Sequence, residues 1–240
     1  MKKAVYDIVN RPHKSIQILK ARPVYKIKRD SIGDIIKFKV RVVVKGYLQK
    51  FGISYFDVFA PVSTVDGFRI IICIATQRNW GLRQFDVSTA YLNAPIEEEI
   101  YVEPPPGFEE PDCRIWLLKK SLYGAKQSAK NWGDLLAKTL REYGFKLASA
   151  DHYIWTTEEL FIGLHVDGLA VAYATEPALD KFTAFIGGEG RLHRQSDDYR
   201  ADCATRAGTW RRLPFGNEVI NWPRAAALAR QESKRTISRP

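Results

Sequence analysis

Cysteine is scarce in this 240-residue chain: Cys73, Cys113 and Cys203 are the three it has, far apart in the sequence. Their number and spacing form neither a disulfide framework nor a metal-ligand pattern, which favours a reducing, intracellular compartment. No apolar run approaches the roughly 18 residues that a membrane helix needs, and the first residues lack the apolar stretch of a signal peptide. We therefore expect neither secretion nor a membrane span.

Acidic residues are scarce at both ends of the chain. Residues 1–50 carry 14 Lys and Arg against 3 Asp and Glu, and residues 187–240 carry 11 against 6, whereas residues 51–186 carry 12 against 18. Basic flanks around an acidic middle suit a protein that holds a polyanion at its edges and keeps carboxylates at its centre. Nucleic-acid binding and an ordinary basic surface both fit this pattern.

Basic and apolar side chains alternate in two runs near the N-terminus, separated by the turn-rich segment "DSIGD". The alternation predicts a hairpin in which residues 24–29 pair with residues 35–44. We expect its inner face to hold Val24, Ile27, Phe38, Val40 and Val42 or their neighbours. The residues expected to project are Lys37, Lys39, Arg41 and Lys45, and a merely solvated face is the alternative.

The rest of the pattern predicts an α+β fold with an antiparallel sheet. Expected helices cover residues 66–78, stopped by Gly81, then "KQSAKNWGDLLAKTLREY", closed by Gly144, and a segment started by Pro177. Expected strands are 82–87, 152–156, 160–166 and 169–174. After residue 186 the apolar periodicity fades, which indicates a loosely ordered tail with one short helix at 223–231.

Two carboxylates fall at the ends of apolar strands, Asp86 and Asp167. Asp167-Gly168 between apolar runs is a strong hairpin signal, so a plain turn is one reading of this dipeptide. The other is a metal site, because two carboxylates brought together from adjacent strands repel until divalent cations neutralise them. That is the arrangement of two-metal phosphoryl transfer.

Three segments carry a resemblance to a known family. They read "VYKIKRDSIGDIIKFKVRVVVKGYLQKFGISYFDVFAPV", "WGLRQFDVSTAYLNAPIEEEIYVEPPPGF" and "LLKKSLYGAKQSAKNW". Together, from about Tyr6 to Phe185, they resemble the reverse transcriptase domain of copia-type LTR retrotransposons. The resemblance implies a right-hand polymerase with fingers, an antiparallel palm sheet and a thumb that is largely missing here. The implied divisions are a lead-in at 1–22, fingers and palm at 23–186, and a diverged basic tail at 187–240.

The resemblance also implies roles for individual positions. Asp86 and Asp167 match the metal-binding, catalytic aspartates, which in the family hold two Mg²⁺ or Mn²⁺ ions. Tyr91 matches the aromatic residue under the nucleotide sugar, although a core aromatic is the alternative. Nucleotide-binding positions implied by the match are Val87, Lys39, Arg41, Lys45, Tyr123, Gly124, Lys126 and Gln127. The implied partners are an RNA or DNA template–primer and deoxynucleoside triphosphates.

One departure from the family pattern touches the metal site. The family's "YVDD" tetrad reads His165-Val166-Asp167-Gly168 here, so Gly168 stands where relatives have a second aspartate. Glycine removes one negative charge from a site that must hold cations and loosens the turn. We expect a reverse transcriptase domain whose copy of the site is impaired. A non-catalytic nucleic-acid-binding remnant and a functionless relic are the alternatives.

Overall fold

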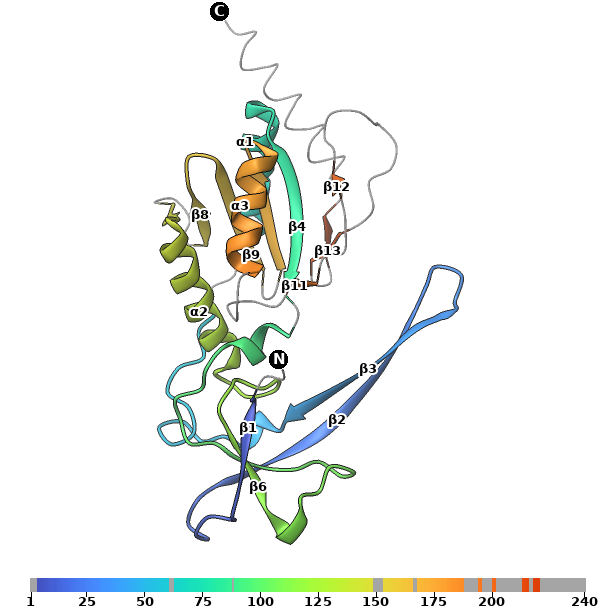
Figure 1. Cartoon of the computed structure of the whole chain (residues 1–240), viewed down its shortest axis with the longest axis vertical. Coiled ribbons are helices and arrows are strands. Elements are labelled where there is room, and N and C mark those ends of the chain that lie inside the picture. The colour runs from blue at the N-terminus through green and yellow to red at the C-terminus, as the bar shows by residue number, and fades with distance from the viewer. Residues whose placement is uncertain are drawn as a thin grey trace, which may run out of the picture. The chain divides into compact units, whose positions relative to one another are not determined.

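The computed structural model describes residues 4–60, 63–87, 89–148, 153–165, 168–187, 194–195, 200–201, 213–215 and 218–220. Over these residues the fold is mixed α+β, as expected (Figure 1). The chain divides into two compact units, unit 1 with residues 1–60 and 89–135, and unit 2 with residues 61–88 and 136–240. The boundaries predicted at residues 22 and 186 stay predictions. No helix among the described residues has the length and apolarity to cross a membrane.

Unit 1 is built on one sheet of mixed direction. Its strands, in spatial order, are β1 (Tyr6–Val9), β6 (Ile115–Leu118), β5 (Tyr101–Glu103), β2 (Ile18–Arg29) and β3 (Ile35–Val44). Most neighbours pair antiparallel, and β2 with β5 is a parallel pair. The core between these strands and their loops is apolar, with Leu19, Val44, Val102 and Trp116 all buried. Short 3-10 turns at Gly46–Leu48, Ala90–Asn93 and Pro111–Cys113 connect the elements.

Strands β2 and β3 form the long twisted hairpin that the sequence predicts, and β2 begins earlier, at Ile18 (Figure 1). The predicted inner face is wrong for four of its five members, while Val42 packs against the core of unit 1. Val24 pairs with Arg41 and so shares the face of the cations, while Ile27, Phe38 and Val40 are 48%, 70% and 50% exposed. The alternation shows that the two faces of the hairpin differ, but not whether other parts of the chain pack on the apolar one. Near the base of the hairpin this apolar face is buried in the core of unit 1, and farther along the strands it is open to solvent.

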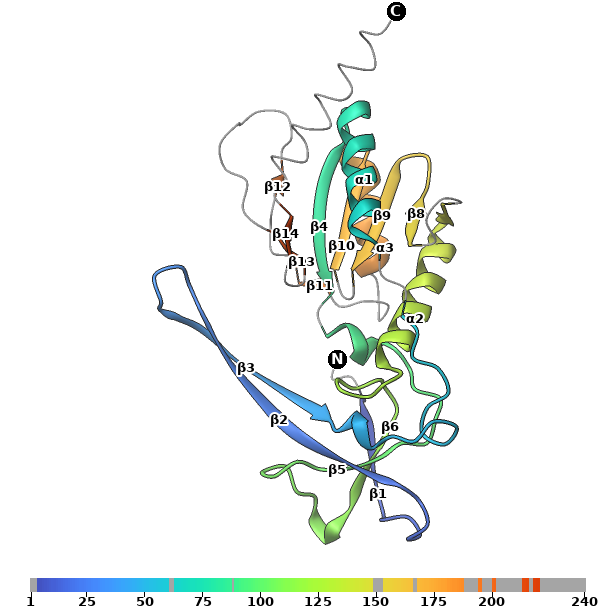
Figure 2. The ribbon, with the colours of Figure 1, turned by 180° about the vertical axis from the view of Figure 1, so that it is seen from behind.

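Unit 2 holds the second sheet. The strands run in the order β4 (Gly81–Val87), β10 (Gly168–Tyr173), β9 (Leu160–His165), β8 (Ile154–Thr156) and β7 (Lys146–Leu147), all antiparallel. Helix α1 (Val65–Arg78) covers one face and helix α3 (Glu176–Gly187) the other, as the front view and the view from behind show (Figure 1, Figure 2). Apolar side chains of α1, among them Phe68 and Ile72, pack on Leu82 and Ala172.

The described parts of the tail contain four short strands. Strands β11 (Arg194–Gln195) and β12 (Arg200–Ala201) pair with the second edge of β4, which makes β4 an interior strand. Strands β13 (Leu213–Phe215) and β14 (Glu218–Ile220) form a separate hairpin. The helix predicted at 223–231 lies outside the described residues.

Helix ends follow local chemistry. The Thr64 hydroxyl accepts a hydrogen bond from the Gly67 amide at 3.0 Å, which caps the start of α1. The helix stops at Asn79, which adopts the left-handed conformation with φ of 53°, and not at the predicted Gly81, which begins β4. Helix α2 (Ser128–Tyr143) buries Trp132 and Leu140, and the following Gly144, the predicted end, has φ of 110°.

The contact between α1 and the sheet depends on a glycine in β9. A Cβ on Gly163 would lie 2.8 Å from Phe68 and 2.9 Å from Ile71, closer than packed carbon atoms tolerate. A side chain at this position would therefore push α1 away from the sheet.

We predict that Gly163→Val lowers the free energy of unfolding by about 1–3 kcal/mol, because overpacking forces the helix off the sheet. Urea titration measures the change. Gly187→Ala, at a glycine with no atom within 4 Å of the added Cβ, is the matched control and should leave stability nearly unchanged. An equal loss in both variants would contradict the packing role of Gly163.

Candidate functional site

The pairing of β4 with β10 defines the surroundings of Asp86. Asp86 is exposed and lies directly opposite Gly168 in the antiparallel register. Directly opposed residues project from the same face of a sheet with Cβ atoms about 4.5–5.5 Å apart. Gly168 has no side chain, so β10 places no carboxylate opposite Asp86 at this pair. A carboxylate at residue 168 would stand beside that of Asp86.

The end of the β9–β10 pairing differs by one residue from the prediction. Gly168 pairs with His165 and is the first residue of β10, so it is a strand residue and not the second residue of an Asp-Gly turn. The competing signal is the strand pairing on both sides of Gly168, which outweighs its local turn preference. Asp167, the second predicted ligand, lies outside the described residues.

The described residues supply one of the two expected carboxylates. Among them no group of three or more His, Cys, Asp or Glu side chains is placed to hold a metal ion. Divalent cations such as Mg²⁺ are bound through carboxylates together with water and substrate phosphates. Asp86 opposite a glycine does not by itself fit a two-metal centre.

Three of the residues implied for nucleotide binding meet in unit 1. The rings of Tyr91 and Tyr123 lie 4.8 Å apart, centroid to centroid, and the Arg41 guanidinium sits 5.5 Å from the centre of the Tyr123 ring. The two rings are tilted by 52° to each other, and this ring contact and the cation–π contact hold the three groups together. The result is an aromatic pair with the Arg41 cation over one of its rings.

Backbone contacts attach the Tyr123 loop to the end of β3. The Val44 amide donates to the Tyr123 carbonyl at 2.8 Å. Gly124, with φ of 89°, lies so close that a Cβ would be 2.2 Å from the Val44 carbonyl oxygen. Only glycine combines this conformation with this approach, so Gly124 positions Tyr123 beside the hairpin strand.

A buried amide network holds the following two residues. Gln127, 1% exposed, donates to the Ser54 carbonyl at 3.0 Å and accepts from the Gln49 amide at 2.9 Å. The Gln49 side-chain oxygen accepts from the backbone amide of Lys126 at 2.8 Å. The Lys126 ammonium donates to the Tyr55 hydroxyl at 3.0 Å. Gln127 thus acts within the protein as a tie between two loops.

Other cations near these loops have different surroundings. The side chain of Lys45 lines a cavity of about 410 Å³ with Arg11, Lys20 and Arg114, and with Glu103, Glu109 and Glu110. Lys130 donates to Asp134 at 2.6 Å, and this hydrogen bond is the main reason that the pKa of Lys130 lies above its ordinary value. Lys130 therefore stays protonated and is neutralised within unit 1.

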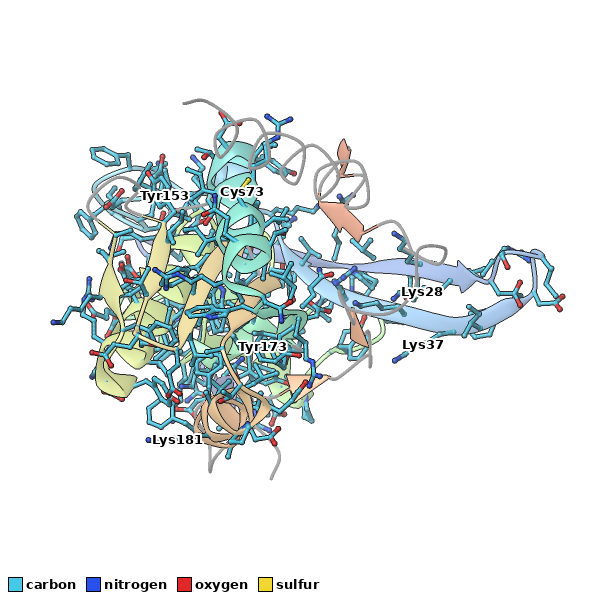
Figure 3. The ribbon with its side chains drawn as sticks, turned by 90° about the horizontal axis from the view of Figure 1, so that it is seen from above. Lys28, Lys37, Cys73, Tyr153, Tyr173 and Lys181 are labelled. Atoms are coloured by element: carbon cyan, nitrogen blue, oxygen red, sulfur yellow. The ribbon has the colours of Figure 1, made fainter. Side chains whose placement is uncertain are left out.

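Sequence reasoning missed two cations of the hairpin. Lys26 pairs with Lys39, and Lys28 pairs with Lys37 (Figure 3 labels Lys28 and Lys37). The four lysines therefore lie on one face of the hairpin, as two directly opposed pairs. Like charges directly opposite each other destabilise a strand pair. The exact register was the missing signal, because alternation alone does not say which residues of β2 oppose those of β3.

The expected site residues divide between the units. Asp86, Val87 and Gly168 belong to unit 2, and the nucleotide-binding positions on the hairpin and its loops belong to unit 1.

The family model described as reverse transcriptase (RNA-dependent DNA polymerase) matches residues 3–191. This chain belongs to that reverse transcriptase family.

Its relatives are polyproteins of copia-type transposons. The chain is 31% identical over 175 residues to the retrovirus-related Pol polyprotein from transposon RE2 of Arabidopsis thaliana, a match of 69% of this chain and 12% of the relative. It is 39% identical over 133 residues to that from transposon TNT 1-94 of Nicotiana tabacum, covering 55% and 10%. The truncated transposon Ty1-A Gag-Pol polyprotein of Saccharomyces cerevisiae is 30% identical over 156 residues, covering 64% and 12%. The chain spans about an eighth of the RE2 polyprotein's length.

We predict that Gln49→Leu lowers the free energy of unfolding by about 1–3 kcal/mol, because it leaves the Lys126 amide and Ser54 carbonyl with fewer buried partners. Thermal or urea unfolding measures the loss. Gln77→Leu, the same change at an exposed position of α1, is the control and should shift stability little. Equal effects would show that the amide network does not stabilise unit 1.

Proposed function

We propose that this chain is the polymerising part of a copia-type reverse transcriptase, with nucleotidyl transfer impaired at its metal site. We infer the impairment from the strand register, in which Gly168 and not a carboxylate residue pairs with Asp86. Unit 1, with its hairpin, corresponds in this proposal to the fingers, and unit 2, with its antiparallel sheet, to the palm of a right-hand polymerase.

Asp86 and Asp167 are the ligands we assign to two Mg²⁺ or Mn²⁺ ions. The chemistry that two bound metal ions would supply there is activation of the primer 3′-hydroxyl and stabilisation of the leaving pyrophosphate. The part of Asp86 is to present a carboxylate at the end of β4. A carboxylate at residue 168 would add negative charge on the same face as Asp86, and glycine supplies none.

The nucleotide-binding assignment concerns unit 1 and the end of β4. Tyr91 would lie under the sugar, with Val87 presenting its backbone to the triphosphate. The contact of Tyr91 with Tyr123, and of Tyr123 with Arg41, supports a shared surface for base and phosphate. Lys39 and Lys45 add positive charge that binds phosphate. Gly124 allows the close approach of the Tyr123 loop to β3. The buried hydrogen bonds of Gln127 and of the Lys126 backbone hold this loop in place.

The lysine face of the hairpin is the part we assign to the RNA or DNA template–primer. Directly opposed lysines, such as Lys28 and Lys37, repel in the isolated protein, and phosphate neutralises both. Such binding does not involve Asp86. It is therefore the activity that a chain with a damaged metal site retains, and it supports nucleic-acid binding without catalysis as the second candidate function.

We predict that Gly168→Asp tightens Mn²⁺ binding and raises nucleotide incorporation on poly(rA)–oligo(dT) by about 10²-fold or more, because the added carboxylate orients the cations. Mn²⁺ binding is followed by electron paramagnetic resonance, and incorporation by primer extension. Adding Asp86→Asn to Gly168→Asp should abolish both gains. Unchanged Mn²⁺ affinity in Gly168→Asp would contradict the assignment of residue 168, whatever the activity.

We further predict that Lys28→Gln with Lys37→Gln weakens template–primer binding and lowers its salt dependence. Each lost phosphate contact reduces the slope of log K against log salt by about 0.7–0.9. Fluorescence anisotropy at several salt concentrations measures this slope. The control, Lys181→Gln with Lys138→Gln, removes the same charge from exposed helix positions and should leave the slope unchanged. A slope that falls equally in both double variants would mean that only net charge matters.

A further inference from the structure

The hairpin has a second face that the proposed function does not use. Opposite the lysines, Tyr25 pairs with Val40 and Ile27 pairs with Phe38, and Ile36, two residues from Phe38, lies at the irregularity where the register shifts. Tyr25 and Phe38 are each 70% exposed, Ile36 65%, Val40 50% and Ile27 48%. This set is called the apolar ribbon face below. It continues the row of Leu19, Ala21 and Val44, which is buried at the hairpin base.

The apolar ribbon face is large for a surface in contact with water. An aromatic side chain of this kind offers about 150–250 Å², so the five side chains together expose roughly 500 Å². Exposed apolar patches of several hundred Å² mark interaction sites more often than bare surface. An isolated two-stranded hairpin is also only marginally stable in water without a cover on its apolar face.

We propose that the apolar ribbon face binds the same face of a second copy of this chain, forming a twofold-symmetric dimer. Two such faces bury on the order of 1,000 Å² between them, the size at which specific interfaces begin. In a twofold contact each surface meets itself, which suits a face of uniform apolar character.

The distribution of the lysines over the hairpin supports a second copy as the partner of the apolar ribbon face. All four opposed lysines lie on the other face of each ribbon, so apolar contact brings no cation against another. The two ribbons would pack face to face at about 10 Å, as stacked sheets do. Both lysine faces then point outward, where they remain available to nucleic acid. Nucleic acid itself is a poor occupant of the apolar face, because its phosphates would lose hydration without gaining a cation.

The test measures the association of the whole chain, freed of nucleic acid by nuclease and high salt. Analytical ultracentrifugation across the micromolar range should show a saturable monomer–dimer equilibrium. Tyr25→Thr and Phe38→Thr, tested singly, should each weaken the dimer by about tenfold or more. Threonine keeps the strand preference, and both side chains are exposed, so circular dichroism should show an unchanged fold.

Two matched controls define the surface. Ile32→Thr changes an apolar side chain that is 81% exposed but lies between the strands of the hairpin, and Lys37→Thr changes the opposite face. Both should leave the dimer intact. A chain that stays monomeric, a dimer that Tyr25→Thr and Phe38→Thr leave unchanged, or one that needs nucleic acid or Lys37 would each overturn the proposal.

Discussion

Antiparallel pairing between β4 and β10 is the constraint on which the candidate metal site depends. Six consecutive residue pairs join these strands, and helices cover the sheet they belong to on both faces. A register shift by one residue would move every side chain to the other face, bringing buried Leu82 and Ala172 out of the core. The core therefore fixes which residue faces Asp86. The chemistry at the strand end is decided by packing several residues away.

Much of this fold could be read from the sequence, because its signals are local and periodic. The hairpin strands, α1, α2 and the β9–β10 pair follow from alternation, helical spacing and caps such as Thr64. The family resemblance from about Tyr6 to Phe185 agrees with the family match at residues 3–191. The inner face of the hairpin could not be read, since alternation shows that two faces differ and not which one the rest of the chain covers. The stop at Asn79 was missed because asparagine is a less common left-handed cap than glycine.

The residue types of the candidate site were predictable from the sequence, but the contacts between these residues were less so. Arg41, Tyr91 and Tyr123 come from three distant segments, and only the folded backbone brings them together. The buried tie between Gln49 and Gln127 has no sequence signature, because a glutamine in a loop is usually solvated. The role of Gln127 as a tie follows from its burial. Its role toward a nucleotide stays a prediction, as do those of Asp86 and Asp167.

The interrupted sequence of unit 1 bears on how the protein is made. Tyr6 pairs with Leu118, and Ile18 pairs with Tyr101, while residues 61–88 between them belong to the other unit. During synthesis the first strands leave the ribosome long before their partners exist. Non-local pairings of this kind close slowly, because loop entropy opposes them until late contacts form. The base of the apolar side of the β2–β3 ribbon, which packs in the core of unit 1, can therefore be covered only after residues 89–135 are synthesised.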